Sequence, residues 1–174
     1  MKSRRSIRQY KNKKIEKEKI KKLEEVCLLS PTSKNKKPCK FIFVENQKTL
    51  EMLSDVKPKG GRMIAASALS VVILADPNLS DVWIEDASIA SAYLHLTCHS
   101  LGLGSCWVQI RNRMKNYDQE IMSETLVKEI LEIPDYYSVL SIVAIGYPNE
   151  IKEHYNSKAL DYDSVYKEKY KGNN

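Results

Sequence analysis

The residues best suited to binding chemistry stand at the start of the chain, where Arg4, Arg5, Ser6 and Arg8 fall within five positions. A guanidinium group presents a planar fork of donors that matches the oxygens of a phosphate or a carboxylate. Arg4 and Arg8 lie two residues on either side of Ser6, so in an extended segment both can face one ligand. The segment therefore predicts a site for a dianionic group, and the alternative is a solvated basic terminus.

Helices and strands that position this segment are predicted from the apolar pattern of the remaining chain. Residues 16–29 carry apolar side chains at helical spacing, and Ser30-Pro31 ends that helix because a residue before proline avoids the helical region. A polar loop follows at 31–40, and Gly102 is placed to end the longest helix as a left-handed cap. Strands are expected at 41–44, 69–75, 105–110 and 138–145, and helices at 16–29, 47–56, 80–101 and 118–132.

The composition predicts one α+β domain over residues 1–174, with helices covering a sheet. Hydrophobic residues make up 43% and charged residues 29% of the chain, and no apolar run approaches the ~18 residues of a membrane span. With no secretory signal recognised and four cysteines outside any metal-site spacing, we expect a cytoplasmic protein with free thiols. The polar tail at 149–174 lacks a core pattern before Val165-Tyr166, so it must lie on something or be disordered.

Three blocks in this order resemble the FMN-dependent nitroreductase family: Arg4 to Arg8, Ser30 to Pro38, and Gly102-Leu103-Gly104-Ser105-Cys106-Trp107 followed by Ile145-Gly146-Tyr147-Pro148. The resemblance implies a three-layer sandwich, with a central, mainly antiparallel sheet flanked by helices, in an intertwined homodimer. It further implies an enzyme that binds FMN and takes a hydride from NADH or NADPH. Electrons would then pass to a nitro compound, quinone or similar small-molecule acceptor in a ping-pong cycle.

The same resemblance implies which residues contact the cofactor. Arg4, Arg5, Ser6 and Arg8 match positions at the phosphate, ribityl chain and pyrimidine edge, and the segment 31–35 matches the loop that reaches the flavin of the other subunit. A main-chain N–H near Gln109 would face the ring atom that receives hydride. The remaining matches are Pro31, Thr32, Ser33, Asn35, Trp107, Val108 and Lys158, the last as the nearest candidate for a phosphate cation. We expect no catalytic side chain, because the cofactor supplies the redox step.

Other interpretations remain open at this point. A flavin-binding relative with different chemistry, such as reductive dehalogenation or consumption of the flavin, would use the loop 57–62 as a substrate lid. A non-enzymatic basic dimer would bind nucleic acid or protein through the net charge of +6, although we expect neither nucleic acid nor membrane as a partner. His95 and His99 have the spacing of a two-histidine metal face, but no third ligand is indicated, so a helix-surface or dimer-interface role is expected.

Overall fold

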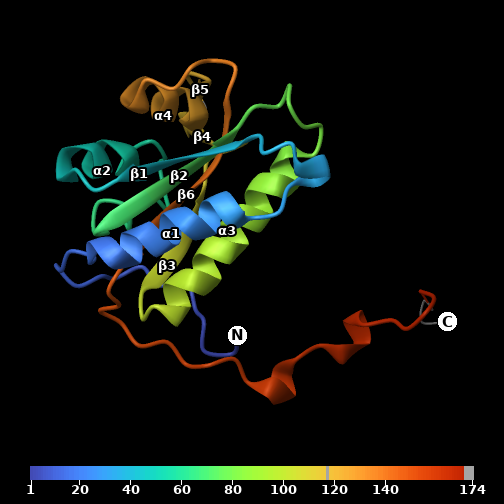
Figure 1. Cartoon of the computed structure of the whole chain (residues 1–174). Coiled ribbons are helices and arrows are strands. Elements are labelled where there is room, and N and C mark those ends of the chain that lie inside the picture. Colours follow the sequence, from blue (N-terminus) through green and yellow to red (C-terminus); the bar gives the residue numbers. More distant parts are fainter. Residues whose placement is uncertain (117, 171–174) are drawn as a thin grey trace.

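A four-stranded antiparallel sheet forms the centre of the computed structural model, which describes residues 1–116 and 118–170 (Figure 1). Its strands are β1 (Cys39–Val44), β2 (Leu69–Ala75), β6 (Ser138–Gly146) and β3 (Gly104–Gln109), in that spatial order. The last strand of the sheet along the chain, β6, therefore lies between β2 and β3. Both β2 and β6 are almost wholly buried, which explains their continuous apolar sequences.

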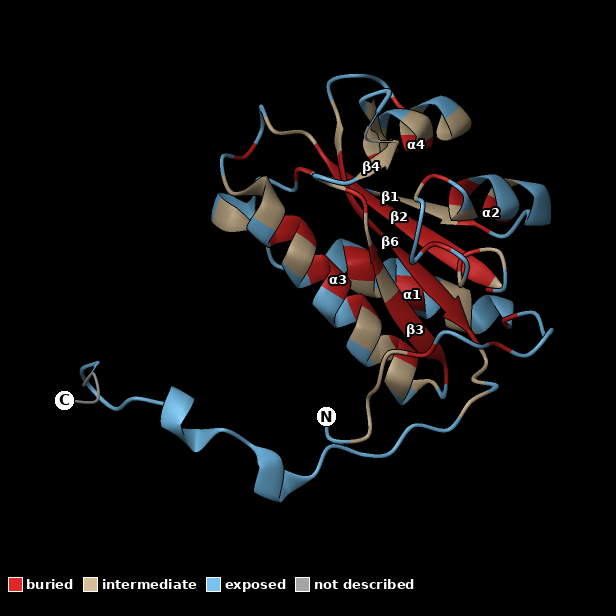
Figure 2. Cartoon of the chain, turned by 180° about the vertical axis from the view of Figure 1, so that it is seen from behind, coloured by how far each residue is buried: buried red, intermediate tan, exposed pale blue. Residues whose placement is uncertain are grey.

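Helices cover both faces of this sheet. On one face lie α1 (Lys17–Leu29) and α3 (Trp83–Ser100), and on the other lie α2 (Gln47–Ser54) and α4 (Ser123–Leu131). Successive residues of β2 point to opposite faces, so Val71 packs in the α1–α3 core while Val72 packs in the α2–α4 core. Figure 2 shows the buried residues concentrated along the sheet and the inner faces of these helices. The predicted three-layer α+β sandwich is confirmed.

Gly102 caps the end of α3, as the sequence predicts. Gly102 adopts φ +73° and donates its N–H to the His99 carbonyl at 3.1 Å. Leu103 donates to the Cys98 carbonyl at 2.8 Å, which completes a Schellman motif. The chain thereby reverses and enters β3 directly.

The predicted helix at 118–132 begins too early. Two short strands, β4 (Met114–Asn116) and β5 (Ile121–Met122), precede α4, which begins at Ser123. The Asn116 side chain accepts the N–H groups of Asp118 and Gln119 at 2.9 and 3.2 Å. These bonds give the backbone a local alternative to the helix, so helical periodicity starts five residues later than predicted.

The C-terminal tail leaves the body of the protein beyond Glu150, and Figure 2 shows it extending past the N-terminus. It contains two short 3₁₀ turns, Ser157–Ala159 and Tyr162–Ser164, and every residue from 151 to 170 is exposed. Residues 171–174, which belonged to the predicted tail, lie outside the described residues. Among the described helices, none combines the length and the apolar character needed to cross a membrane.

Candidate functional site

The arginine segment, residues 4–8, lies against the outer edge of β3. Ile7 donates its N–H to the Ser105 carbonyl at 3.1 Å, and its buried side chain covers Gly104. The Tyr10 hydroxyl donates to the Ile7 carbonyl at 2.6 Å and lies 3.0 Å from the Ala144 carbonyl in β6. Burial raises the pKa of Tyr10, so this hydroxyl keeps its proton and its donor role. The backbone of the segment is thus attached to two strands of the sheet.

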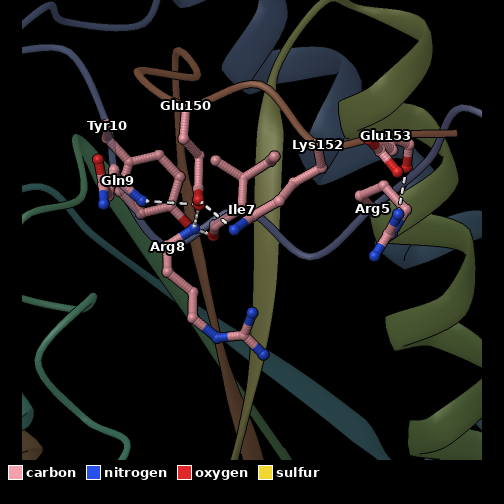
Figure 3. A network of polar contacts seen from close by, with 8 residues as sticks. All are labelled: Arg5, Ile7, Arg8, Gln9, Tyr10, Glu150, Lys152 and Glu153. Atoms are coloured by element: carbon pink, nitrogen blue, oxygen red, sulfur yellow. Dashed lines mark hydrogen bonds and ion pairs between the residues drawn. The ribbon is translucent and has the colours of Figure 1, made fainter.

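A carboxylate fixes the next part of the segment. Glu150 accepts the main-chain N–H groups of Arg8 and Gln9 through one oxygen, at 2.5 and 3.2 Å, and pairs with Lys152 at 2.6 Å through the other (Figure 3). These hydrogen bonds hold the pKa of Glu150 below its usual range, and the bond from the Arg8 N–H has the largest effect. Because Glu150 binds the backbone and not the guanidinium, the Arg8 side chain points away from the network in Figure 3.

The three arginines differ in what they already bind. None of them forms an ion pair with a carboxylate within residues 1–116 and 118–170. Arg5 nevertheless donates to the Glu153 carbonyl and lies 4.7 Å from the centre of the Tyr155 ring, so it holds the start of the tail. Arg4 and Arg5 both line a pocket of about 210 Å³, and Arg8 is exposed. Among the described residues, the guanidinium groups of Arg4 and Arg8 have no hydrogen-bond or ion-pair partner and are open to an anionic ligand.

Two histidines of α3 contact the elements around the arginine segment, one at β3 and one at the N-terminus. His95 Nδ1 lies 2.7 Å from the Ser105 hydroxyl, and His99 Nε2 lies 2.8 Å from the Ser3 hydroxyl. Burial, with a smaller effect of Arg4, lowers the pKa of His95 to about 4, so its ring is neutral at pH 7. The His95 ring therefore lies against β3 and the His99 ring against the N-terminal segment, and both residues are half-buried. The described residues hold no cluster of three side chains suited to a metal ion.

The outer edge of β3 continues beyond the arginine segment as Trp107 and Gln109. Ile110 donates its N–H to the Leu140 carbonyl at 3.2 Å, and it follows Gln109, which pairs with Ser141. In an antiparallel ladder alternate residues direct their N–H groups to opposite sides, so Gln109 directs its N–H away from β6.

Side-chain bonds stabilise this edge. Trp107 Nε1 donates to Gln109 Oε1 at 3.0 Å, and Gln109 Nε2 donates to the Arg111 carbonyl at 2.9 Å. Val108, which was also predicted to contact the flavin, has its side chain buried in the α2–α4 core, and its N–H faces β6 because it alternates with that of Gln109. Cys106 is a packed thiol as predicted, since burial keeps its pKa above the usual range.

The predicted flavin loop, residues 31–35, does not join the arginine segment within one subunit. Ser33 is attached to Asp86 at the start of α3, whereas Ser3 is attached to His99 near its end. The thirteen-residue separation along the helix corresponds to about 20 Å. Figure 1 shows the two segments at opposite ends of α3. Pro31, Thr32 and Asn35 lie in this loop with Ser33 and are exposed or half-buried.

Lys158, the predicted phosphate cation, is exposed in the first 3₁₀ turn of the tail. Its neighbours are bound to the N-terminus, because Tyr155 donates its N–H to the Lys2 carbonyl at 3.0 Å and Lys2 Nζ donates to the Ser157 hydroxyl at 2.6 Å. Within the described residues, the Lys158 side chain forms no ion pair.

Sequence reasoning missed the groups that hold the site, which are Tyr10, Glu150 and Asp86. Tyr10 and Glu150 act on segments more than 130 residues away in the chain, so no local pattern indicates them. Asp86 had a usable signal, since it is an acidic residue inside a stretch rich in alanine and serine that predicted close packing on several sides. A carboxylate at a buried helical position needs donors from a neighbouring segment.

Comparisons with known proteins show which family this chain resembles over most of its length. The family model described as "Nitroreductase family" matches residues 1–60 and 57–147. An Archaeoglobus fulgidus protein, provisionally named an NADH dehydrogenase/NAD(P)H nitroreductase, is 34% identical over 97% of this chain and 95% of its own length. The solved structure of an FMN-dependent nitroreductase from Clostridium difficile is 45% identical, covers 97% of both chains and superposes with a TM-score of 0.94. The NADPH:FMN oxidoreductase of Vibrio harveyi, solved with NAD⁺, shares the fold at 18% identity, with a TM-score of 0.82 over 99% of this chain and 77% of its own.

Proposed function

Because the chain belongs to the nitroreductase family, we propose that it is an FMN-dependent oxidoreductase that takes a hydride from NADH or NADPH and passes electrons to a small acceptor. The acceptors that we propose are nitro compounds and quinones, reduced in a ping-pong cycle. The observation that carries the assignment of the site is the pair of guanidinium groups, Arg4 and Arg8, free of carboxylate partners in the described chain and placed beside the outer edge of β3. Bound FMN supplies the redox chemistry.

The donors of this site fit the chemistry of FMN. Its phosphate is a dianion, and charge-assisted hydrogen bonds from Arg4 and Arg8 are the strong kind that such a group accepts. The Ser6 hydroxyl, half-buried between them, can donate to or accept from a ribityl hydroxyl. Tyr10 and Glu150 hold the backbone of this segment, so the main chain that carries these donors is in place before the ligand arrives.

The Gln109 main-chain N–H supplies the electrostatic part of the mechanism. It points out of the sheet on the edge where the arginine segment lies, and a fixed N–H donor stabilises negative charge that develops beside it. The bonds from Trp107 to Gln109 and from Gln109 to Arg111 restrict this edge, so the donor does not have to reorganise. No side-chain acid or base is required of the protein in this mechanism, because the cofactor carries the hydride.

A homodimer is part of the proposal, because one subunit does not bring the two predicted flavin-contacting segments together. The loop 31–35 is attached near Asp86 and the arginine segment near His99, about 20 Å apart along α3. A two-fold related copy can place its loop beside the arginine segment of the first subunit, and the reverse contact follows by symmetry. Each flavin would then contact both subunits.

Exposed apolar side chains support the same assembly. Ile89, Tyr93 and Leu96 follow each other at helical spacing on α3 and are 38%, 45% and 40% exposed. The tail adds further apolar side chains that are exposed in the single chain, including Leu160, Val165 and Tyr166. Exposed apolar side chains that follow one face of a helix are typical of an interaction site.

All four cysteines are free, which fits the reducing cytoplasm that we propose as the location.

The test begins with the visible absorption spectrum of the purified protein, recorded anaerobically before and after addition of NADH and then NADPH. We expect flavin bands that bleach with at least one donor and return when a nitro compound or quinone is added. A colourless protein that also fails to take up added FMN would refute the proposal.

The residue assignment is tested with Arg8→Ala, which removes one guanidinium from the proposed phosphate site. A charge-assisted hydrogen bond contributes about 1.5–3 kcal/mol, so the Kd for FMN should rise about ten- to a hundredfold. Lys14→Ala is the control, because Lys14 is an exposed cation six residues further along the chain. Equal FMN affinity in Arg8→Ala and in the wild type would exclude Arg8 from the site.

A further inference from the structure

The loop that follows α1 has a backbone shape that its own residues disfavour. Lys34, Asn35 and Lys37 all adopt left-handed conformations, with φ of 51°, 54° and 49°. Asparagine tolerates this region, but each lysine there costs about 1–2 kcal/mol. Such strain persists only where neighbouring groups over-determine the conformation, and it concentrates at ligand-binding segments. The groups that hold this loop therefore matter for what the loop does.

Asp86 is the group from outside the loop that holds it. It is 2% exposed and is the only charged residue among the buried ones in the described chain. Its Oδ1 accepts the Ser33 N–H at 2.8 Å, and its Oδ2 accepts the Ser80 hydroxyl at 3.0 Å. Within residues 1–116 and 118–170 it has no lysine or arginine partner. The negative charge is stabilised by these two donors and by its position in the first turn of α3.

The loop's internal bonds extend this anchor to the strained residues. Lys36 donates its N–H to the Ser33 carbonyl at 3.0 Å, and Lys37 donates its N–H to the Thr32 hydroxyl at 3.1 Å. Ser33 therefore links Asp86 on one side to the turn containing Asn35 on the other. A carboxylate is expensive to bury, and an apolar residue at this position would pack without that cost, so stability alone does not account for Asp86.

We propose that Asp86 is the positioning residue of the loop 32–37: its carboxylate holds the Ser33 N–H and thereby keeps the loop in the left-handed shape that presents Thr32, Ser33 and Asn35 to the flavin of the partner subunit. This inference rests on the proposed function. Asp86 itself is buried under the loop, so it acts through Ser33 and does not touch the cofactor.

The test compares Asp86→Ala, Asp86→Asn and Glu85→Ala in two assays. Glu85 is the matched control, because it carries the same charge one residue earlier in the same helical turn and is exposed. The first assay is limited trypsin digestion of the cofactor-free protein under native conditions, with cleavage after Lys34 and Lys36 followed by mass spectrometry. The second is the Kd for added FMN.

For Asp86→Ala we expect cleavage in the loop to accelerate at least tenfold and the Kd for FMN to rise about tenfold. Asp86→Asn should recover most of both properties, since an amide oxygen still accepts the Ser33 N–H and its NH₂ group can donate to the Ser80 hydroxyl. Glu85→Ala should match the wild type. A folded Asp86→Ala protein with wild-type loop cleavage and wild-type FMN affinity, whatever its melting temperature, overturns the proposal.

A measurement on the wild type covers the case in which Asp86→Ala does not fold. Amide hydrogen exchange should show the Ser33 N–H protected and the neighbouring Lys34 N–H exchanging faster, because the Asp86 bond is made by Ser33. An unprotected Ser33 amide overturns the proposal. Failure of the wild type to bind FMN would instead refute the proposed function. Digestion and hydrogen exchange would still show whether Asp86 fixes the conformation of the loop.

Discussion

Substitution of Gly104 by alanine tests how the arginine segment is positioned. A Cβ atom at Gly104 would lie 2.7 Å from Cβ of Ile7 and 2.9 Å from each of its two Cγ atoms. Carbon atoms in contact prefer about 3.5–4.0 Å, so the two residues must separate by about 1 Å. The Ile7 Cβ is bonded directly to the backbone, and no side-chain rotation can move it away. The arginine segment itself has to shift.

The magnitude follows from two effects. Overpacking a buried contact typically costs about 1–3 kcal/mol. The shift also stretches the hydrogen bond from the Ile7 N–H to the Ser105 carbonyl, now 3.1 Å, whose loss costs about 1 kcal/mol more. We therefore expect Gly104→Ala to lower the free energy of unfolding by about 2–4 kcal/mol. Displacement of Arg4 and Arg8 should raise the Kd for FMN at least tenfold, on the rule that about 1.4 kcal/mol is tenfold.

Gly102→Ala is the control for Gly104→Ala. Gly102 has φ +73°, and a Cβ added there would meet open space, so alanine at this position suffers backbone strain of about 1–2 kcal/mol without touching the arginine segment. Urea unfolding of the cofactor-free proteins measures stability, and fluorescence titration measures FMN affinity. We expect both variants to lose stability and only Gly104→Ala to lose affinity. A Gly104→Ala protein that is destabilised yet binds FMN like the wild type would refute the link between this contact and the flavin site.

Two further predictions concern pH and assembly. His95 has a pKa lowered to about 4 against an unfolded value of about 6.5, so its neutral form stabilises the fold above pH 6.5 and this contribution is lost as the pH falls toward 4. Between pH 7.5 and pH 5.0 the free energy of unfolding should fall by about 2 kcal/mol more in the wild type than in His95→Asn. An equal fall in both proteins would contradict the lowered pKa of His95. Leu96→Asp places a charge in the exposed apolar stripe of α3 and should reduce the solution mass from about 40 kDa, twice that of the 20.0 kDa chain, to that of one chain. Met52→Asp, at an exposed position on the opposite side of the sheet, should leave the mass unchanged, and a dimer that survives Leu96→Asp would exclude that stripe from the interface.

The order and type of most elements follow from the sequence itself. Apolar residues at period 3.6 or in short continuous runs predict α1, β2 and β6 within a residue or two, because burial of a face imposes that spacing locally. Ser30-Pro31 and Gly102 mark helix ends through backbone constraints that act at the residue itself. The start of α4 was misplaced, since the bonds of the Asn116 side chain compete with a helical pattern too short to dominate.

The geometry of the candidate site depends on contacts between distant parts of the chain. No local pattern places β6 between β2 and β3, and none attaches Arg8 to Glu150 or Ser33 to Asp86. The residue types that bind an anion were readable from the sequence because guanidinium chemistry belongs to the side chain alone. Whether these guanidinium groups are open to a ligand depends on long-range packing that only the folded chain establishes. The same packing separates the loop from the arginine segment along α3.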